Sequence, residues 1–388
     1  MAPRFLPAIA TQSLGRAPHH PIATKLALIA SAGFHAVELF MEDLEHLAHQ
    51  LRSTSTRPHL THDAALLAAA THISDLCAHH SLHILCLQPF ANYEGLLSPS
   101  AHASRLRDLR LWFRLARALR TDLIQIPSSY LPADQCTGER SRVVADLREA
   151  ADLGLQCEPP VRFAYEALAW GTHADRWEQV WEVVEEVDRV NFGCCLDTFN
   201  LLGREWADPA RGDGLVPGAE GRLEVVLQRL RTRLDPRKVF YIEAVDGERL
   251  DEPLVEGHPF YHEDQPARMS WSRNARLFPC EEKGYLPVVQ TLQAIVDAGY
   301  EGYVSFEFFS RTAHEQGDHV PREHAERARR SWHRMCEEMG WEDCMKARNI
   351  DAPVPSLAQD IGVLSPPPPP SAPALAHQHS MSAALQAH

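Results

Sequence analysis

The sequence lacks several patterns that mark common classes of protein. None of its nine cysteines forms a Cys-x-x-Cys pair, so neither a zinc knuckle nor a disulfide framework is predicted. No run of about 18 apolar residues occurs, and residues 1–6 do not resemble a signal peptide. We therefore expect a cytoplasmic protein that does not enter the membrane.

The motifs of common nucleotide-binding proteins and hydrolases are also absent. The chain contains no G-x-G-x-x-G, no Walker A loop, no G-x-S-x-G and no H-E-x-x-H. Its 38 basic and 52 acidic residues give a net charge of −14. Nucleic-acid-binding domains are more often basic, so a nucleic-acid partner is disfavoured and a small-molecule substrate is expected.

Strand-like and helix-like segments alternate eight times over residues 1–350. Strands are predicted at 5–11, 35–40, 81–88 and 122–127, and as four runs that end at positions 166, 197, 243 and 307. Helices are predicted at 22–33, 62–80, 101–120, 139–153, 174–188, 221–233, 285–299 and 322–339. The regular alternation predicts one α/β domain, a (β/α)8 TIM barrel.

Three segments fall outside this alternation. Residues 203–221 form a long polar connection, and residues 247–283 are irregular and rich in proline, arginine and aromatic residues. A connection as long as the second is usually functional when it lies inside a compact domain. Residues 351–388 contain a run of prolines and are predicted to be a disordered tail, since they cannot bury enough apolar surface to order themselves.

Four of the predicted strands end on an acidic residue: Glu166, Asp197, Glu243 and Glu307. The carboxyl ends of the strands of a parallel barrel converge on one mouth, where catalytic groups sit. Four carboxylates in a partly dry site repel one another, and a divalent cation relieves the repulsion. Oxygen ligands suit hard cations, so we expect Mg²⁺, Mn²⁺ or Co²⁺ at this site rather than zinc.

The abundance of histidine does not change the predicted ligand set. Of the 22 histidines, many fall on predicted helices or loops, where we expect solvated surface: His19, His20, His79, His80, His102 and His324. Residues 322–330 alternate basic and acidic side chains and are likewise predicted to form a solvated helix face.

Residues 269–276 form the second informative stretch. They follow the strand of Glu243 and are predicted to form a loop over the same mouth. The stretch contains Arg273 and Arg276, and arginine pairs well with carboxylates through two parallel hydrogen bonds. We therefore expect a clamp for an anionic substrate.

Several segments resemble the 3-dehydroshikimate dehydratases of fungal quinate catabolism, which belong to the xylose-isomerase-like TIM barrels. The resembling segments span roughly residues 5–345 and include 32–40, 87–95, 165–171, 196–200, 268–278 and 304–307. The acid at each strand end marks only the wider superfamily. The Met-Ser-Trp-Ser-Arg stretch at 269–273 is much more specific to the dehydratases.

The resemblance implies a hydro-lyase that converts 3-dehydroshikimate to protocatechuate and water with the help of a divalent metal. It implies a metal site made by the four strand-end acids, with Glu166, Glu243 and Asn200 as the candidate catalytic residues. It implies substrate contacts from Gln88, Trp170, Ser272, Arg273 and Arg276.

Two positions depart from the family pattern. Glu243 stands where a glutamine is expected, and Asn200 stands where bacterial members carry a histidine that acts as acid or base. The base is therefore open between these positions, and one hypothesis is that Glu243 replaces the missing histidine.

Alternatives of other kinds stay open at this point. A sugar or hydroxy-keto-acid isomerase or epimerase of the same superfamily would use the same metal chemistry without needing an arginine clamp. A non-catalytic metal-binding paralogue would keep the acids for regulation. The outer helices of a barrel also leave room for a homo-oligomer.

Overall fold

Eight parallel strands close into a barrel in the computed structural model, which describes residues 4–54 and 60–347. The strands run in the order β1-β10-β7-β6-β5-β4-β3-β2. Their bounds are β1 Phe5–Ala10, β2 Ala36–Phe40, β3 His83–Gln88, β4 Leu123–Pro127, β5 Arg162–Glu166, β6 Phe192–Asp197, β7 Val239–Glu243 and β10 Gly302–Phe306. The predicted TIM barrel is confirmed, whereas the predicted tail at 351–388 lies outside the described residues.

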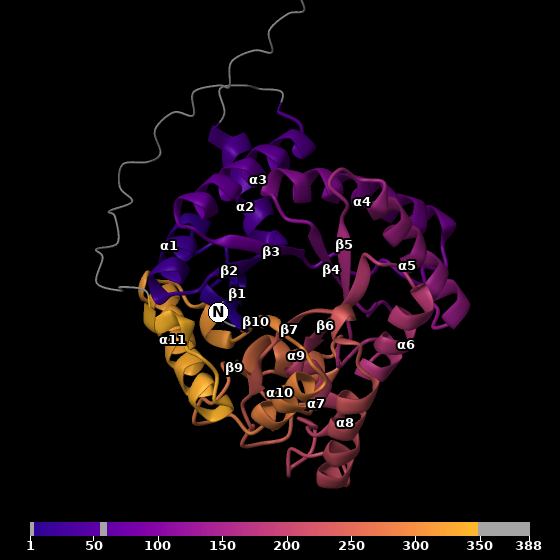
Figure 1. The fold of residues 1–388 in the computed structure, drawn as a ribbon, viewed down its shortest axis with the longest axis vertical. Coiled ribbons are helices and arrows are strands. Elements are labelled where there is room, and N and C mark those ends of the chain that lie inside the picture. The colour runs from indigo at the N-terminus through magenta and orange to yellow at the C-terminus, as the bar shows by residue number, and fades with distance from the viewer. Residues whose placement is uncertain (1–3, 55–59, 348–388) are drawn as a thin grey trace, which may run out of the picture. The chain divides into compact units, whose positions relative to one another are not determined.

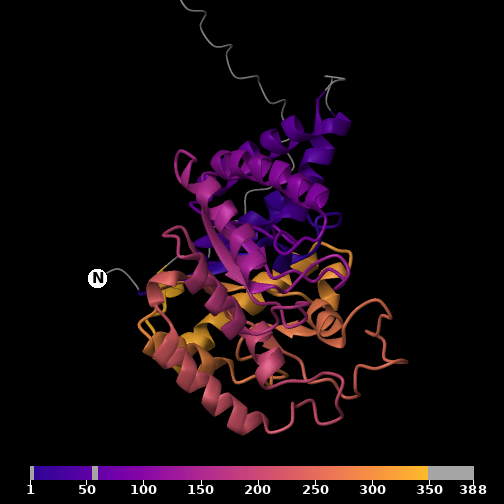
Figure 2. The ribbon, with the colours of Figure 1, turned by 90° about the vertical axis from the view of Figure 1, so that its right-hand side faces the viewer.

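Helices surround the strands as an outer ring (Figures 1 and 2). Their bounds are α1 Ile22–Ala32, α2 Met41–Thr54, α3 His62–His79, α4 Pro99–Leu119, α5 Arg140–Leu155, α6 Trp177–Val187, α7 Thr198–Glu205, α8 Ala219–Arg233, α9 Ala267–Ala275, α10 Val288–Asp297 and α11 His319–Met339. Short 3₁₀ segments lie at η1 Thr11–Leu14, η2 Pro236–Lys238, η3 Arg311–His314 and η4 Cys344–Ala347. Among the helices of the described ranges, none is both long and apolar enough to cross a membrane.

Because side chains alternate between the two faces of each strand, the apolar residues of the barrel form two layers. A small cluster fills the barrel interior and includes Ala36, Ala164 and Tyr241, whereas Phe163 and Tyr165 pack in the larger core that includes the helices. Because successive side chains of a strand point to opposite faces, the residue two positions after Ala164 also points inward. That residue is Glu166, so the same alternation that builds the core aims the acid into the barrel.

The strand register brings the acids to one end of the barrel. Glu166 pairs with Cys195 across β5 and β6, and Asp197 pairs with Glu243 across β6 and β7. Ser305 pairs with Glu243 across β10 and β7, so Glu307 follows just past the same level. The four acids therefore lie at the carboxyl ends of neighbouring strands.

The segment predicted to be an irregular loop over the mouth contains regular structure. Helix α9 begins after Pro266, and the strands β8 (Asp246–Gly247) and β9 (Arg276–Leu277) pair antiparallel. The loop prediction for 269–276 was wrong because α9 is short and is held by its packing, with Trp271 fully buried. Helices α2 and α7 were not predicted either.

Two histidines expected at the surface are buried. His20 is 1% exposed and His324 is 3% exposed. The ring of His324 is hydrogen-bonded to the carbonyl of Ser13 at 2.9 Å and the hydroxyl of Thr312 at 3.0 Å. The prediction of a solvated face at 322–330 was wrong for this side of the helix, where Ala328 is also buried, although Arg322, Glu323 and Glu326 are exposed.

Candidate metal centre

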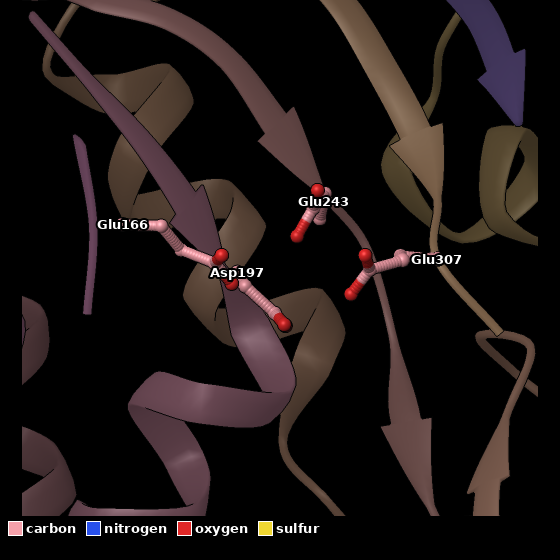
Figure 3. Close-up of side chains that lie close together, drawn as sticks. All are labelled: Glu166, Asp197, Glu243 and Glu307. Atoms are coloured by element: carbon pink, nitrogen blue, oxygen red, sulfur yellow. The ribbon is translucent and has the colours of Figure 1, made fainter. Parts of the chain in front are cut away.

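The four strand-end acids form one buried cluster. Each of Glu166, Asp197, Glu243 and Glu307 offers a carboxylate oxygen, and these oxygens lie within 4.8 Å of one another. Figure 3 shows the four side chains converging from separate strands. All four are at most 5% exposed, so water compensates little of their charge.

Asp197 has a second role that fixes its position. It is the last residue of β6 and also the N-cap of α7, where its Oδ1 accepts hydrogen bonds from the backbone N–H groups of Phe199 (2.7 Å) and Asn200 (3.3 Å). An aspartate is well suited to capping a helix in this way. The other oxygen, Oδ2, is left to face the cluster.

Amide side chains orient the two acids of β5 and β6. Nδ2 of Asn200 donates to Oε1 of Glu166 at 2.8 Å and to Oδ2 of Asp197 at 2.7 Å. Oδ1 of Asn200 accepts from the backbone N–H of Ala169 at 3.0 Å. Nε2 of Gln125 donates to the other oxygen of Glu166. Both oxygens of Glu166 are therefore held by amides, and both ends of the Asn200 amide are occupied.

Arg276 enters the cluster from β9 and is 1% exposed. Its Nη1 donates to Oδ2 of Asp197 and to Oε2 of Glu307, both at 2.9 Å, and its Nε donates to the hydroxyl of Ser272 at 2.9 Å. Its guanidinium carbon lies 4.6 Å from the centre of the Phe199 ring. Within the described residues Nη2 makes no hydrogen bond, so it is the nitrogen still available to a ligand.

A fifth carboxylate lies beside Glu243 of the cluster. Glu38 of β2 is fully buried and accepts hydrogen bonds from the hydroxyl of Ser305, from Nε2 of Gln88 (3.0 Å) and from the thiol of Cys86 (3.5 Å). The sequence analysis did not include Glu38 in the site. Its signal was strand parity, since Ala36 lies in the interior cluster and Glu38 is two residues further along.

The electrostatics favour a bound cation. Burial and neighbouring acids raise the pKa values of Glu166 and Glu243 well above the ordinary range. Burial raises the pKa of Glu307 to about 8, although Arg276 opposes the shift. Oε2 of Glu243 is buried and has no hydrogen-bond partner in the described structure. Four carboxylates face one guanidinium, so this donor set fits a divalent cation held by oxygen ligands.

The five residues expected to contact substrate lie at different depths. Gln88 is the last residue of β3, is buried, and donates to Glu38. Ser272 is buried and supports Arg276, whereas Trp170 is only partly buried in the connection after β5. Arg273 is exposed. The partial burial of its guanidinium group lowers its pKa, Tyr130 opposes this shift, and Arg16 adds to it. Of the two arginines, only Arg273 has its side chain at the surface.

The chain resembles known proteins over most of its length. A family model described as "Xylose isomerase-like TIM barrel" matches residues 26–339. The 3-dehydroshikimate dehydratase of Neurospora crassa is 45% identical over 336 residues, which cover 86% of this chain and 94% of that protein.

A bacterial relative and a solved structure extend the comparison. The 3-dehydroshikimate dehydratase of Pseudomonas aeruginosa is 31% identical to this chain over 286 residues. The match covers 74% of this chain and 36% of that longer protein. A solved "xylose isomerase-like TIM barrel/4-hydroxyphenylpyruvate dioxygenase fusion protein" is 26% identical with a TM-score of 0.64. That match covers 86% of this chain and 43% of the fusion protein, so this chain corresponds to less than half of it.

Proposed function

Because the chain belongs to the xylose isomerase-like TIM barrel family and, within it, to the 3-dehydroshikimate dehydratases, we propose that it removes water from 3-dehydroshikimate to give protocatechuate. The observation that carries this proposal is the 45% identity to the Neurospora crassa dehydratase across 94% of that protein. Action in quinate breakdown in the cytoplasm is part of the same proposal.

The acid cluster supplies the metal site of this proposal. Glu166, Asp197, Glu243 and Glu307 would hold one divalent cation, with Mg²⁺, Mn²⁺ and Co²⁺ as the candidates. Such a cation, when bound, supplies Lewis-acid stabilisation of the negative charge that develops on the substrate ketone oxygen. Asn200 and Gln125 keep the carboxylates in place by donating to them.

Two arginines recognise the substrate carboxylate in this proposal. Arg273 reaches the surface at the end of α9 and provides the charge that a carboxylate meets on entry. Arg276 is held by Ser272, Asp197 and Glu307 and presents Nη2. Trp170 and Ser272 are assigned to contact the substrate as well, and Gln88 holds Glu38 by donating to it.

Glu243 is the proposed base because its carboxylate is the least engaged of the four. Its Oε1 accepts one long hydrogen bond from the hydroxyl of Tyr241 at 3.4 Å, its Oε2 accepts none in the described ranges, and the carboxyl of Glu38 lies beside it. Asn200 cannot take up a proton as a histidine does, and both ends of its amide are occupied. We therefore assign proton transfer to Glu243 and ligand orientation to Asn200.

A direct assay tests the proposal. Purified protein is stripped of metal and supplied in turn with Mg²⁺, Mn²⁺ or Co²⁺, together with 3-dehydroshikimate, and the absorbance of the catechol product is followed. We expect product with at least one cation, none with the Glu166→Gln variant, and no turnover of a neutral ketose in place of the substrate. Absence of product with every cation, while the protein binds the cation, would refute the dehydratase assignment.

A further inference from the structure

A cavity of about 100 Å³ lies outside the barrel and has no part in the proposed reaction. It is next to β5, whose Tyr165 points outward while Glu166 points into the acid cluster. The lining residues that matter here are Glu94, Ser129, Thr137, Arg140, Tyr165 and His173. Tyr165 lies in β5, and the others come from the connections after β3, β4 and β5 and from the start of α5.

Two buried polar atoms of this lining accept no hydrogen bond within the described residues. Glu94 is 3% exposed and Ser129 is 7% exposed. Oε1 of Glu94 accepts from the backbone N–H of Ser129 at 2.6 Å and from the hydroxyl of Tyr165 at 3.0 Å. Oε2 of Glu94 and Oγ of Ser129 are without such a partner. Leaving buried oxygens unsatisfied is costly, which points to a ligand that binds both.

The carboxylate of Glu94 also needs a balancing charge. Arg140 lines the same cavity, but its guanidinium pairs with Glu182 at 2.5 Å and Glu186 at 3.1 Å. Asp146 of α5 adds a further negative charge nearby. Across residues 4–54 and 60–347, Glu94 forms no ion pair of its own, and a buried unpaired carboxylate is unfavourable.

We propose that this cavity is a binding site for a monovalent cation, held by the carboxylate of Glu94 and the hydroxyls of Ser129 and Tyr165. One carboxylate supplies one negative charge, whereas Ca²⁺ and Mg²⁺ are usually bound by more charge or keep a large water shell. Since a water occupies roughly 30 Å³, the cavity has room for a small ion and one or two waters. K⁺, Na⁺ and ammonium share this chemistry.

The site would stabilise the loops behind the metal centre. Glu94, Ser129 and Tyr165 belong to three successive strand–loop junctions, so one ion joins all three. Ser128, next to Ser129, donates its backbone N–H to the carbonyl of Glu166 at 2.8 Å. A cation at Glu94 would thus hold the backbone that carries the first of the cluster acids.

Thermal unfolding tests the site without any substrate. The full chain, stripped of divalent metal, is unfolded at pH 8 in KCl, NaCl, NH₄Cl or choline chloride at equal ionic strength. Choline is the control because its methyl groups keep oxygen ligands away from its charge. We expect the Tm to be about 2 °C higher in at least one of the first three salts. The gain should vanish in Glu94→Gln, shrink in Ser129→Ala and persist in Glu224→Gln, an exposed control on α8.

The pH dependence of the salt effect on Tm provides a second test. Burial raises the pKa of Glu94 to about 7, while the Ser129 N–H and the Tyr165 hydroxyl oppose the shift. The charged and titratable groups around it include Tyr93, Cys136, Tyr165, Asp146, Arg140 and His173. Below pH 7 a proton competes for the carboxylate, so the salt-dependent gain should be smaller at pH 6 than at pH 8.

Two outcomes would overturn the cation site. Equal Tm values in all four salts would mean that the cavity holds water and a protonated Glu94 only, and a gain that survives in Glu94→Gln would place the ion elsewhere. If Glu94→Gln does not fold, the response of Ser129→Ala decides. Because no activity is measured, a failed dehydratase assay and a failed cation effect are separate results.

Discussion

The Nη1 nitrogen of Arg276 lies 2.9 Å from Oδ2 of Asp197, although 79 residues separate them in the chain. The contact joins the short strand β9 to the end of β6. Both partners are almost fully buried, with side-chain exposures of 1% and 0%. The segment after β7 is therefore bound to the acid cluster and is more than a cover over the barrel mouth.

Replacing Arg276 by methionine should destabilise the metal-free protein strongly. The change leaves Asp197 and Glu307 buried without their cation, and breaking such a pair costs about 3–5 kcal/mol. A bound divalent metal replaces part of the lost charge, so the loss of stability should be smaller with Mn²⁺. Urea unfolding with and without Mn²⁺ measures both quantities.

Arg273→Met is the matched control on the same helix. Arg273 is exposed, so its loss should change the unfolding free energy by less than about 0.5 kcal/mol. Under the proposed clamp it should raise KM for 3-dehydroshikimate. If Arg273→Met lowered stability as much as Arg276→Met, the assignment of different roles to the two arginines would be wrong.

Glu243→Gln and Asn200→Ala should separate proton transfer from ligand orientation. Under the proposal, Glu243→Gln lowers kcat by about 10²-fold or more, because an amide cannot accept the proton. Asn200→Ala removes two hydrogen bonds to cluster acids and should weaken metal binding by about 10–100-fold. Calorimetric Mn²⁺ titration and steady-state kinetics distinguish the two effects.

Asn274→Ala serves as the control for these variants. The Asn274 amide donates to the carbonyl of Ser270 within α9 and makes no hydrogen bond to a cluster acid in the described residues. Its loss should leave the Mn²⁺ affinity unchanged. Full turnover by Glu243→Gln combined with loss of turnover in Asn200 variants would exclude Glu243 as the base.

Gly247→Ala should disturb the junction of β8 with α9. A Cβ at this position would lie 2.5 Å from the Trp271 ring and 3.1 Å from the Phe199 ring. Both rings are fully buried, so we expect a loss of about 1–3 kcal/mol in unfolding free energy from overpacking. Gly221→Ala, in the exposed first turns of α8 with nothing within 4 Å, should instead be neutral or stabilise by up to about 1 kcal/mol.

The alternation of side chains along the strands was the sequence feature that predicted most of the fold and of the acid cluster. An apolar run with an acid at its end identifies both a buried strand and the direction of the acid, which is why Glu166 and Glu307 were placed correctly at the barrel mouth. The same rule applied to Glu38 of β2. Glu38 is followed by two further residues of β2, so the feature shared by the four acids, a position at the very end of a strand, does not identify it.

Features that depend on contacts between residues far apart in the chain could not be predicted from the sequence. Helix α9 is fixed by Arg268, which donates to the carbonyls of Gly203 and Ala207 more than 60 residues away. Trp271 likewise donates to the carbonyl of Glu248 across the β8–β9 pair. No local sequence pattern identifies such partners, so the nine-residue helix α9, in a stretch rich in arginine, was predicted to be a loop.

The burial of His324 predicts a pH dependence of stability. Burial lowers its pKa from 6.5 to about 4, with Arg327 adding to the shift and the Ser13 carbonyl opposing it. Between these two pH values the unfolded chain binds a proton that the folded chain does not. The contribution of His324 to stability is therefore complete above pH 6.5 and falls as the pH drops toward 4, by on the order of 3 kcal/mol.

A variant comparison isolates this contribution from the acids, which titrate in the same range. His324→Asn keeps a polar side chain but cannot bind a proton, so its unfolding free energy should fall less steeply than that of the wild type between pH 6.5 and 5. His49→Asn, at an exposed position on α2, should follow the wild-type slope. The measurement is urea unfolding at half-unit pH steps with saturating Mn²⁺. Parallel curves for wild type and His324→Asn would mean that His324 takes up its proton over the same pH range in the folded and the unfolded chain, and would contradict the prediction.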